Sequence, residues 1–210
     1  MSARLILARH GDTFSPGEKI VFVGARFNPP LTERGRAQAR AGAAELSRRG
    51  LVPARVLCGP LRRTRQAAQL IAEALGAPAP EPDERLREID HGAWEGKSAA
   101  EIRALFGAAQ FSAYDGRGEW PEGAGFSPPR RDVLARVEAL LAEAAAAPGT
   151  PLYVTSNGVL RLFAERAGAP PQAAKMRTGA LSFLRLSGAC ARTDASVEAS
   201  IEAWNLSPEL

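Results

Sequence analysis

The sequence contains few of the residues on which disulfide, metal and redox chemistry depend. Its 210 residues include two cysteines, Cys58 and Cys190, and two histidines. Two distant cysteines form neither a disulfide framework nor a metal-binding spacing, so we expect reduced thiols, a cytoplasmic protein and no metal site. The N-terminus has no basic segment followed by a long apolar stretch, and no apolar run has the length of a membrane span. We therefore expect no membrane partner.

The sequence also lacks a pattern for binding nucleic acid. The formal net charge is +4, and Arg far outnumbers Lys. The arginines are spread along predicted helices, which is typical of a solvated surface. Aromatic residues do not alternate with basic ones, as a groove for single strands would require. We expect no nucleic-acid partner, whereas the charge is compatible with a small anionic substrate.

Short apolar segments alternate with helical patterns over most of the chain. This alternation predicts an α/β fold, a three-layer α/β/α sandwich with a mostly parallel central sheet and an antiparallel edge. Helices are expected at 30–50, with Thr32 as N-cap, and at 61–76, 98–106 and 131–147. Strands are expected at 3–8, 54–59 and around 152–154, followed by a closing hairpin at 180–188 and 196–205.

A single domain fits the whole chain, residues 1–210, because no internal repeat or linker divides it. We expect an inserted cover segment at about 92–131. Within it, residues 107–131 are rich in Gly, Pro and aromatic side chains, and they are predicted to form an irregular excursion over a site.

The stretch "ARHGDT" (8–13) places polar side chains directly after the first predicted strand. Arg9 offers a planar fork that suits phosphate oxygens. His10 is a capable nucleophile when neutral, and nearby guanidinium groups oppose its protonation. Taken alone, the stretch is almost equally compatible with a histidine that merely ends a strand.

Three further motifs follow in order: "LTERGRAQA" (31–39), "CGPLRRTRQAA" (58–68) and "LREIDHGAWEG" (86–96). Together with "ARHGDT", they resemble the histidine phosphatase superfamily, which includes cofactor-dependent phosphoglycerate mutases. The resemblance covers nearly the whole chain, and four motifs in this order are highly specific.

The resemblance implies a role for four residues. His10 matches the nucleophile that becomes phosphohistidine, and Arg9 and Arg63 match the two phosphate-binding arginines. Glu88 matches the acid that protonates the leaving group, whereas Arg62 and Arg65 are expected at the surface or the substrate rim. Phosphoryl transfer needs these parts: an in-line nucleophile, cations on the equatorial oxygens and an acid for the leaving oxygen. No cofactor is expected, and His91 is expected at the rim.

The stretch "LYVTSNGVLR" (152–161) departs from the resemblance. The family has a second histidine at the end of this strand, where this chain has Ser156 followed by Asn157. A serine hydroxyl is shorter and carries no charge, so we expect Ser156 and Asn157 to line the phosphate pocket as weaker partners. A nucleophilic Ser156 of the α/β-hydrolase type is disfavoured, because Val154 replaces the required glycine and no histidine follows. The sequence also leaves open whether serine is the natural residue at this position.

A second departure follows the first motif. Many relatives carry a phosphate-binding asparagine shortly after "RHG", where this chain has "DTFSPG" (12–17). Thr13 or Ser15 would have to replace it. The apolar stretch at 20–23 is compatible with a substrate rim or a self-association surface, and a homodimer is one open oligomeric state.

These features predict a phosphatase that hydrolyses small phosphomonoesters through a phosphohistidine at His10. Its partners are a small phosphorylated substrate or inorganic phosphate. Two alternatives stay open. The serine at 156 is compatible with a degenerate member that binds a phosphorylated ligand or a protein partner with little turnover, and arginines in the cover segment are compatible with a phosphoglycerate mutase-type phosphotransferase.

Overall fold

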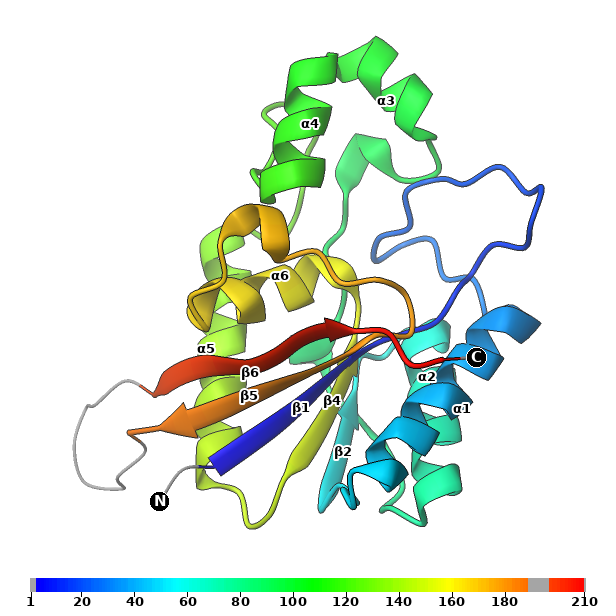
Figure 1. Cartoon of the computed structure of the whole chain (residues 1–210). Helices are drawn as coiled ribbons and strands as arrows, with labels where there is room; N and C mark the ends of the chain where they lie inside the picture. Colours follow the sequence, from blue (N-terminus) through cyan, green and yellow to red (C-terminus); the bar gives the residue numbers. More distant parts are fainter. Residues whose placement is uncertain (1–2, 189–196, 210) are drawn as a thin grey trace.

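A six-stranded mixed sheet forms the centre of the protein in a computed structural model that describes residues 3–188 and 197–209 (Figure 1). The strand order is β3-β2-β4-β1-β5-β6. The strands are β1 (Ala3–Arg9), β2 (Arg55–Cys58), β3 (Glu81–Pro82), β4 (Pro151–Thr155), β5 (Leu181–Ser187) and β6 (Glu198–Leu206). The α-helices are α1 (Glu33–Arg48), α2 (Arg62–Leu75), α3 (Ala99–Phe106), α4 (Ala108–Arg117), α5 (Arg130–Ala146) and α6 (Asn157–Arg166).

The sheet is parallel from β3 to β1 and antiparallel at its other edge. β1 pairs with β4 in parallel, and β4 and β3 both pair with β2 in parallel. β5 pairs with β1 in the antiparallel sense, and β6 pairs with β5 in the same sense. The predicted fold class and the antiparallel edge hairpin are therefore confirmed.

Helices cover both faces of the sheet, so the central strands are buried on both sides. All five residues of β4 are buried, as expected for a parallel strand between two helical layers. One core cluster joins the sheet to α1 and α2 through residues such as Leu46, Ile71 and Val154. A second cluster joins the opposite face to α5 and α6 through residues such as Val137 and Phe163. Figure 1 shows these two layers on either side of the strands.

Local signals in the sequence mark the start of α1 and the end of α2. The Thr32 hydroxyl accepts a hydrogen bond from the Gly35 N–H at 3.0 Å and caps α1. Gly76 follows α2 in the left-handed conformation (φ 60°), which glycine adopts without steric cost.

Two further α-helices, α3 and α4, lie beyond the end of the sheet (Figure 1). The prediction that residues 107–131 are irregular is wrong for α4, which is helical over Ala108–Arg117. Phe111 and Tyr114, three residues apart, turn one face of α4 toward Trp94, and all three side chains are buried. These aromatic contacts stabilise a helix that its glycine-rich surroundings do not indicate.

None of the helices in the described ranges is both long and apolar enough to cross a membrane. Cys58 is buried as a free thiol, and burial raises its pKa to about 11. Cys190 lies outside the described residues.

Candidate active site

The strands β1 and β4 end side by side and bring two segments of the sequence together. Arg9 is the register partner of Thr155, and the His10 N–H donates a hydrogen bond to the Thr155 carbonyl at 3.2 Å. The next residue after Thr155 is Ser156, so His10 and Ser156 leave the sheet at the same edge. The carboxyl ends of parallel strands are where ligands bind in α/β proteins.

A close backbone contact fixes the turn after His10. A Cβ atom on Gly11 would lie 2.2 Å from the Gly35 carbonyl oxygen, so only glycine fits. The same close approach excludes a side chain at Gly35, because a Cβ there would lie 2.2 Å from the Asp12 carbonyl oxygen. The glycines of two sequence motifs thus let the end of β1 and the start of α1 touch.

Hydrogen bonds fix the proton on the His10 ring. Nδ1 lies 2.8 Å from the Gly11 carbonyl oxygen, which can only accept, so Nδ1 carries the proton. The Arg63 Nε donates to the His10 Nε2 at 3.2 Å. Because guanidinium nitrogen cannot accept, Nε2 has a lone pair directed toward Arg63. Nε2 is therefore the nucleophilic atom of this ring.

The same surroundings keep His10 uncharged. Its side chain is buried, and this burial lowers its pKa well below 6.5, with the charges of Arg63 and Arg9 acting in the same direction. A neutral imidazole keeps its nucleophilic lone pair at neutral pH.

Arg63 is held in the first turn of α2 without any exposure to solvent. Its two terminal nitrogens donate to the carbonyls of Gly24 (2.9 Å) and Phe27 (3.2 Å). The segment before α1 therefore folds over Arg63 and fixes its plane. Such a fixed guanidinium offers hydrogen bonds to an anion without losing further conformational entropy.

Arg9 is the second cation at this edge of the sheet. Its Nη1 donates to the Met176 carbonyl, whereas its buried Nε has no hydrogen-bond partner among the described residues. Burial lowers the pKa of Arg9 to about 10, with Glu88 and Asp12 opposing the shift. The guanidinium therefore stays charged at neutral pH and retains a free donor.

Glu88 is held by backbone donors from two segments. Its Oε1 accepts from the Ile89 N–H at 2.9 Å and its Oε2 from the Gly158 N–H at 3.1 Å. A Cβ on Gly158 would lie 2.4 Å from Oε1, so the glycine allows the carboxylate to reach the start of α6. The buried carboxylate therefore lies at the same end of the sheet as Ser156, two residues before Gly158.

Ser156 and Asn157 start α6 with different partners. The Ser156 side chain is 1% exposed, and its Oγ has no hydrogen-bond partner within the described part of the chain. The Asn157 Oδ1 accepts from the Met176 N–H at 3.0 Å, so Asn157 fixes the segment to which Arg9 also binds. Buried polar atoms are normally paired, whereas Ser156 Oγ and Arg9 Nε have no hydrogen-bond partner within the described residues.

The comparison with known proteins identifies the family of this chain. Residues 5–195 match the sequence pattern of the Histidine phosphatase superfamily (branch 1). The chain belongs to the histidine phosphatase superfamily. The structure brings residues of its four sequence motifs together at one edge of the sheet, as the contacts of His10, Gly35, Arg63 and Glu88 show.

Both mutases and phosphatases are among the similar proteins. A 2,3-bisphosphoglycerate-dependent phosphoglycerate mutase of Methylobacterium sp. (strain 4-46) is 35% identical over 139 residues, 65% of this chain and 65% of that protein. A glucosyl-3-phosphoglycerate phosphatase of Mycobacterium tuberculosis is 31% identical over 171 residues, 75% of this chain and 71% of that protein. The aligned part spans 44% of a phosphoserine phosphatase 1 of Hydrogenobacter thermophilus, which is 38% identical over 99 residues, 47% of this chain.

Solved structures share the fold over almost the whole chain. A native mycobacterial glucosyl-3-phosphoglycerate phosphatase superposes with a TM-score of 0.78 at 28% identity, covering 98% of this chain and 99% of the other. The complex of that mycobacterial phosphatase with inorganic phosphate gives a TM-score of 0.75 at 27% identity, covering 98% of both chains.

The prediction that His91 lies at the rim of the substrate site is wrong. His91 is 4% exposed, and its ring lies edge-on to Phe22, Tyr114 and Phe126. Its Nε2 lies 2.6 Å from the Tyr114 hydroxyl. Position 91 is therefore part of the aromatic cluster beneath α4. Arg62 and Arg65, in contrast, are exposed as predicted.

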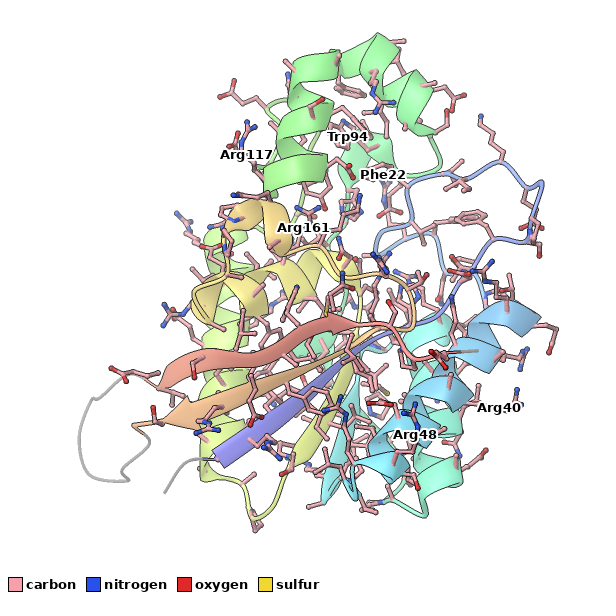
Figure 2. The ribbon with its side chains drawn as sticks, in the orientation of Figure 1. Phe22, Arg40, Arg48, Trp94, Arg117 and Arg161 are labelled. Atoms are coloured by element: carbon pink, nitrogen blue, oxygen red, sulfur yellow. The ribbon has the colours of Figure 1, made fainter. Side chains whose placement is uncertain are left out.

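Two residues without a predicted role connect α4 to the elements that hold Glu88. Tyr114 contacts His91, three residues after Glu88, and its backbone carbonyl accepts from Arg161 Nη1 at 3.2 Å. Arg161 also donates to the Asp115 carbonyl, and it lies between α4 and α6 (Figure 2). The spacing of Phe111 and Tyr114 is the one sequence signal that indicates this helix face.

The two buried histidines predict a pH-dependent stability. Burial lowers the pKa of both His10 and His91 below 6.5, so the unfolded chain binds more protons than the folded one below that pH. Stability therefore falls as the pH falls, by up to about 1.4 kcal/mol per pH unit for each histidine. In urea unfolding between pH 7 and 5.5, His91→Phe should reduce this slope by about half. An unchanged slope would contradict a neutral, buried His91.

Proposed function

We propose that this chain is a phosphomonoesterase that forms a phosphohistidine at His10. The observation that carries the proposal is the fixed His10 ring, with its proton on Nδ1 and its Nε2 lone pair facing Arg63 at 3.2 Å. In the proposed reaction, Nε2 attacks the phosphorus atom and the bond to the leaving alcohol breaks. Glu88, in its protonated form, gives its proton to the leaving oxygen.

The phosphoryl group would be bound by the unpaired donors at this edge. Arg9 Nε and the Ser156 hydroxyl have no partners within the described residues. Arg63 Nε would exchange its hydrogen bond to His10 Nε2 for one to a phosphoryl oxygen. We assign Asn157 to the same pocket because it fixes Met176 beside Arg9. Thr13, which is partly buried and follows His10 by three residues, completes the proposed set. Water then attacks the phosphohistidine, and Glu88 accepts the proton of that water.

The proposed enzyme is cytoplasmic, and it acts on a small phosphorylated substrate or binds inorganic phosphate. Residues 92–131 are proposed to cover the site as part of a single domain. The named relatives include mutases and phosphatases, so a phosphoglycerate mutase-type transfer is the second candidate. A third candidate is a binding protein with little turnover, which the loss of a charged donor at Ser156 favours.

A substrate panel tests the function. The purified chain should release phosphate from p-nitrophenyl phosphate and from at least one of a set of sugar, nucleotide and glycerate phosphates. Activity should be unchanged by a chelator, because the arginines already neutralise the phosphoryl oxygens. Interconversion of 2- and 3-phosphoglycerate without phosphate release would favour the mutase. Tight phosphate binding without turnover would favour the binding protein.

Ser156 should limit the rate of this enzyme. Ser156→His would add a longer donor that can carry charge, and turnover should rise by about tenfold or more if the ring reaches the phosphoryl oxygens. Ser156→Ala should weaken phosphate binding only modestly, since one neutral hydrogen bond contributes about 1 kcal/mol. Turnover and phosphate binding are measured alongside melting temperature, because the site is tightly packed. Loss of all turnover in Ser156→Ala, with activity retained in His10→Ala, would make Ser156 the nucleophile.

A further inference from the structure

A cavity of about 610 Å³ lies between α4 and α6, and Ile89 and Gly158 form part of its wall. The backbone N–H groups of these two residues hold the two oxygens of Glu88. We call this space the α4–α6 cavity. Glu88 itself does not line the cavity, but two residues of its wall hold the Glu88 carboxylate, so this cavity is the candidate space for an alcohol that takes a proton from Glu88.

The inner surface of the α4–α6 cavity is largely apolar. Ile89 and Leu162 are buried beneath it, and Trp120 and Pro171 line it from the segments that follow α4 and α6. Trp120 is partly buried and contacts the Phe126 ring at 5.7 Å between centroids. Such a wall binds a flat or ring-shaped apolar surface better than a short charged chain.

Two of the three arginines around the α4–α6 cavity are paired with carboxylates. At its rim, Arg117 pairs with Glu119 at 2.5 Å, and Arg130 pairs with Glu165. A substrate with a second anionic group would meet both carboxylates and would have to displace them from their arginines. These two rim pairs therefore reduce the attraction of Arg117 and Arg130 for a second anion.

Arg161 forms the remaining cationic part of the wall (Figure 2). Its terminal nitrogens donate to the carbonyls of Tyr114 and Asp115, and the charges of Asp115 and Glu88 lie close enough to raise its pKa against the lowering effect of burial. Its Nε has no partner among the described residues. Two hydrogen bonds to backbone carbonyls thus fix the orientation of the Arg161 guanidinium.

A second cavity, of about 670 Å³, has the opposite character. It is lined by Arg9 together with Arg34, Lys175 and Arg177, and no part of the backbone that holds Glu88 lines it. Its basic lining would suit an anion, and none of its lining residues holds Glu88 by a hydrogen bond. The hydrogen bonds from Ile89 and Gly158 to Glu88 therefore favour the α4–α6 cavity for the leaving group.

We propose that the α4–α6 cavity receives the leaving alcohol, and that this alcohol is uncharged and carries an apolar ring. The proposal rests on the proposed phosphomonoesterase activity and adds the class of its substrate. Trp120 and Leu162 would contact the ring. Phosphate esters of glycerate or serine, which bring a carboxylate, would be poor substrates.

Four alkyl phosphates of similar intrinsic reactivity test the pocket: benzyl phosphate, ethyl phosphate, 3-phosphoglycerate and phosphoserine. We expect kcat/KM for benzyl phosphate to exceed that for 3-phosphoglycerate and for phosphoserine by at least about tenfold, the scale of one buried ring contact. Trp120→Ala should lower kcat/KM for benzyl phosphate by about tenfold and for ethyl phosphate by less than about threefold. Trp204→Ala, which removes a partly buried indole from β6, is the matched control and should not change the benzyl-to-ethyl ratio.

A charge variant tests the role of the rim pairs. Glu165→Gln releases Arg130 from its carboxylate, so kcat/KM for 3-phosphoglycerate should rise relative to that for benzyl phosphate. A wild-type preference for 3-phosphoglycerate or phosphoserine would overturn the proposal. Equal losses on benzyl and ethyl phosphate in Trp120→Ala would also overturn it.

A binding measurement separates this proposal from the proposed function. Calorimetry with benzylphosphonate and 3-phosphonopropionate, neither of which is hydrolysed, should show tighter binding of benzylphosphonate that depends on Trp120. That result without turnover of any phosphomonoester would remove the enzymatic function but keep the ligand class. Turnover of p-nitrophenyl phosphate with tighter binding of 3-phosphonopropionate would keep the function and contradict the ligand class.

Discussion

His10→Ala should reduce phosphomonoester turnover by at least about 10⁴-fold, since no other group takes over a removed nucleophile. The structure supports this magnitude, because Nε2 is the one ring atom whose lone pair faces Arg63. The measurement is phosphate release from p-nitrophenyl phosphate by each purified variant. The fold should survive, since the lost ring makes hydrogen bonds only to Gly11 and Arg63 within the described residues.

His91→Phe is the matched control for this loss, because it removes the only other histidine of the chain. A phenyl ring fits the aromatic cluster around position 91, so turnover should be largely retained. Loss of activity in His91→Phe with activity kept in His10→Ala would show that His91, and not His10, is the nucleophile. Melting temperatures of both variants separate a lost nucleophile from a lost fold.

Glu88→Gln should slow the hydrolysis of alkyl esters far more than that of an activated aryl ester. An alkoxide leaves poorly without a proton, so ethyl phosphate turnover should fall by about 10²-fold or more. The p-nitrophenolate ion leaves without help, so its ester should lose less than about tenfold. The measurement is the ratio of kcat/KM for the two esters in the wild type and the variant.

Glu84→Gln provides the control for the acid. Glu84 is an exposed carboxylate paired with Arg87 at 2.6 Å, four residues before Glu88, and its loss should leave both esters unaffected. Equal slowing of both esters in Glu88→Gln would indicate that Glu88 only supports the start of α6 through Gly158.

The parts of the fold that were predicted correctly have local causes in the sequence. Thr32 marks the start of α1 and Gly76 marks the end of α2, because each caps its helix through contacts with neighbouring residues alone. The buried run of β4 likewise identifies a central strand without knowledge of its partners. Local signals of this kind are sufficient for the three α/β/α layers, whereas the strand order β3-β2-β4-β1-β5-β6 comes from the structure.

The errors lie where distant contacts outweigh local signals. α4 is helical because Phe111 and Tyr114 pack on Trp94, although the glycines around it favour an irregular chain. His91 is buried because Phe22, far away in the sequence, closes one side of its ring. The link from Tyr114 to Arg161 joins segments 47 residues apart, and no pattern in either segment predicts it.

The candidate site could be assigned by motif but not by geometry. The sequence identifies His10 and Arg63 as partners, whereas the ring tautomer follows only from the Gly11 carbonyl and the Arg63 donor in the fold. The roles of Ser156 and Arg9 as unpaired donors likewise require knowledge of what surrounds them.

Trapping the covalent intermediate tests the central claim most directly. The chain is incubated with a ³²P-labelled reactive phosphomonoester, denatured under alkaline conditions and digested. The account predicts an acid-labile, base-stable phosphate on the peptide that contains His10, and no label in His10→Ala. An acid-stable phosphate on the peptide that contains Ser156 would contradict it, as would turnover without any label on His10.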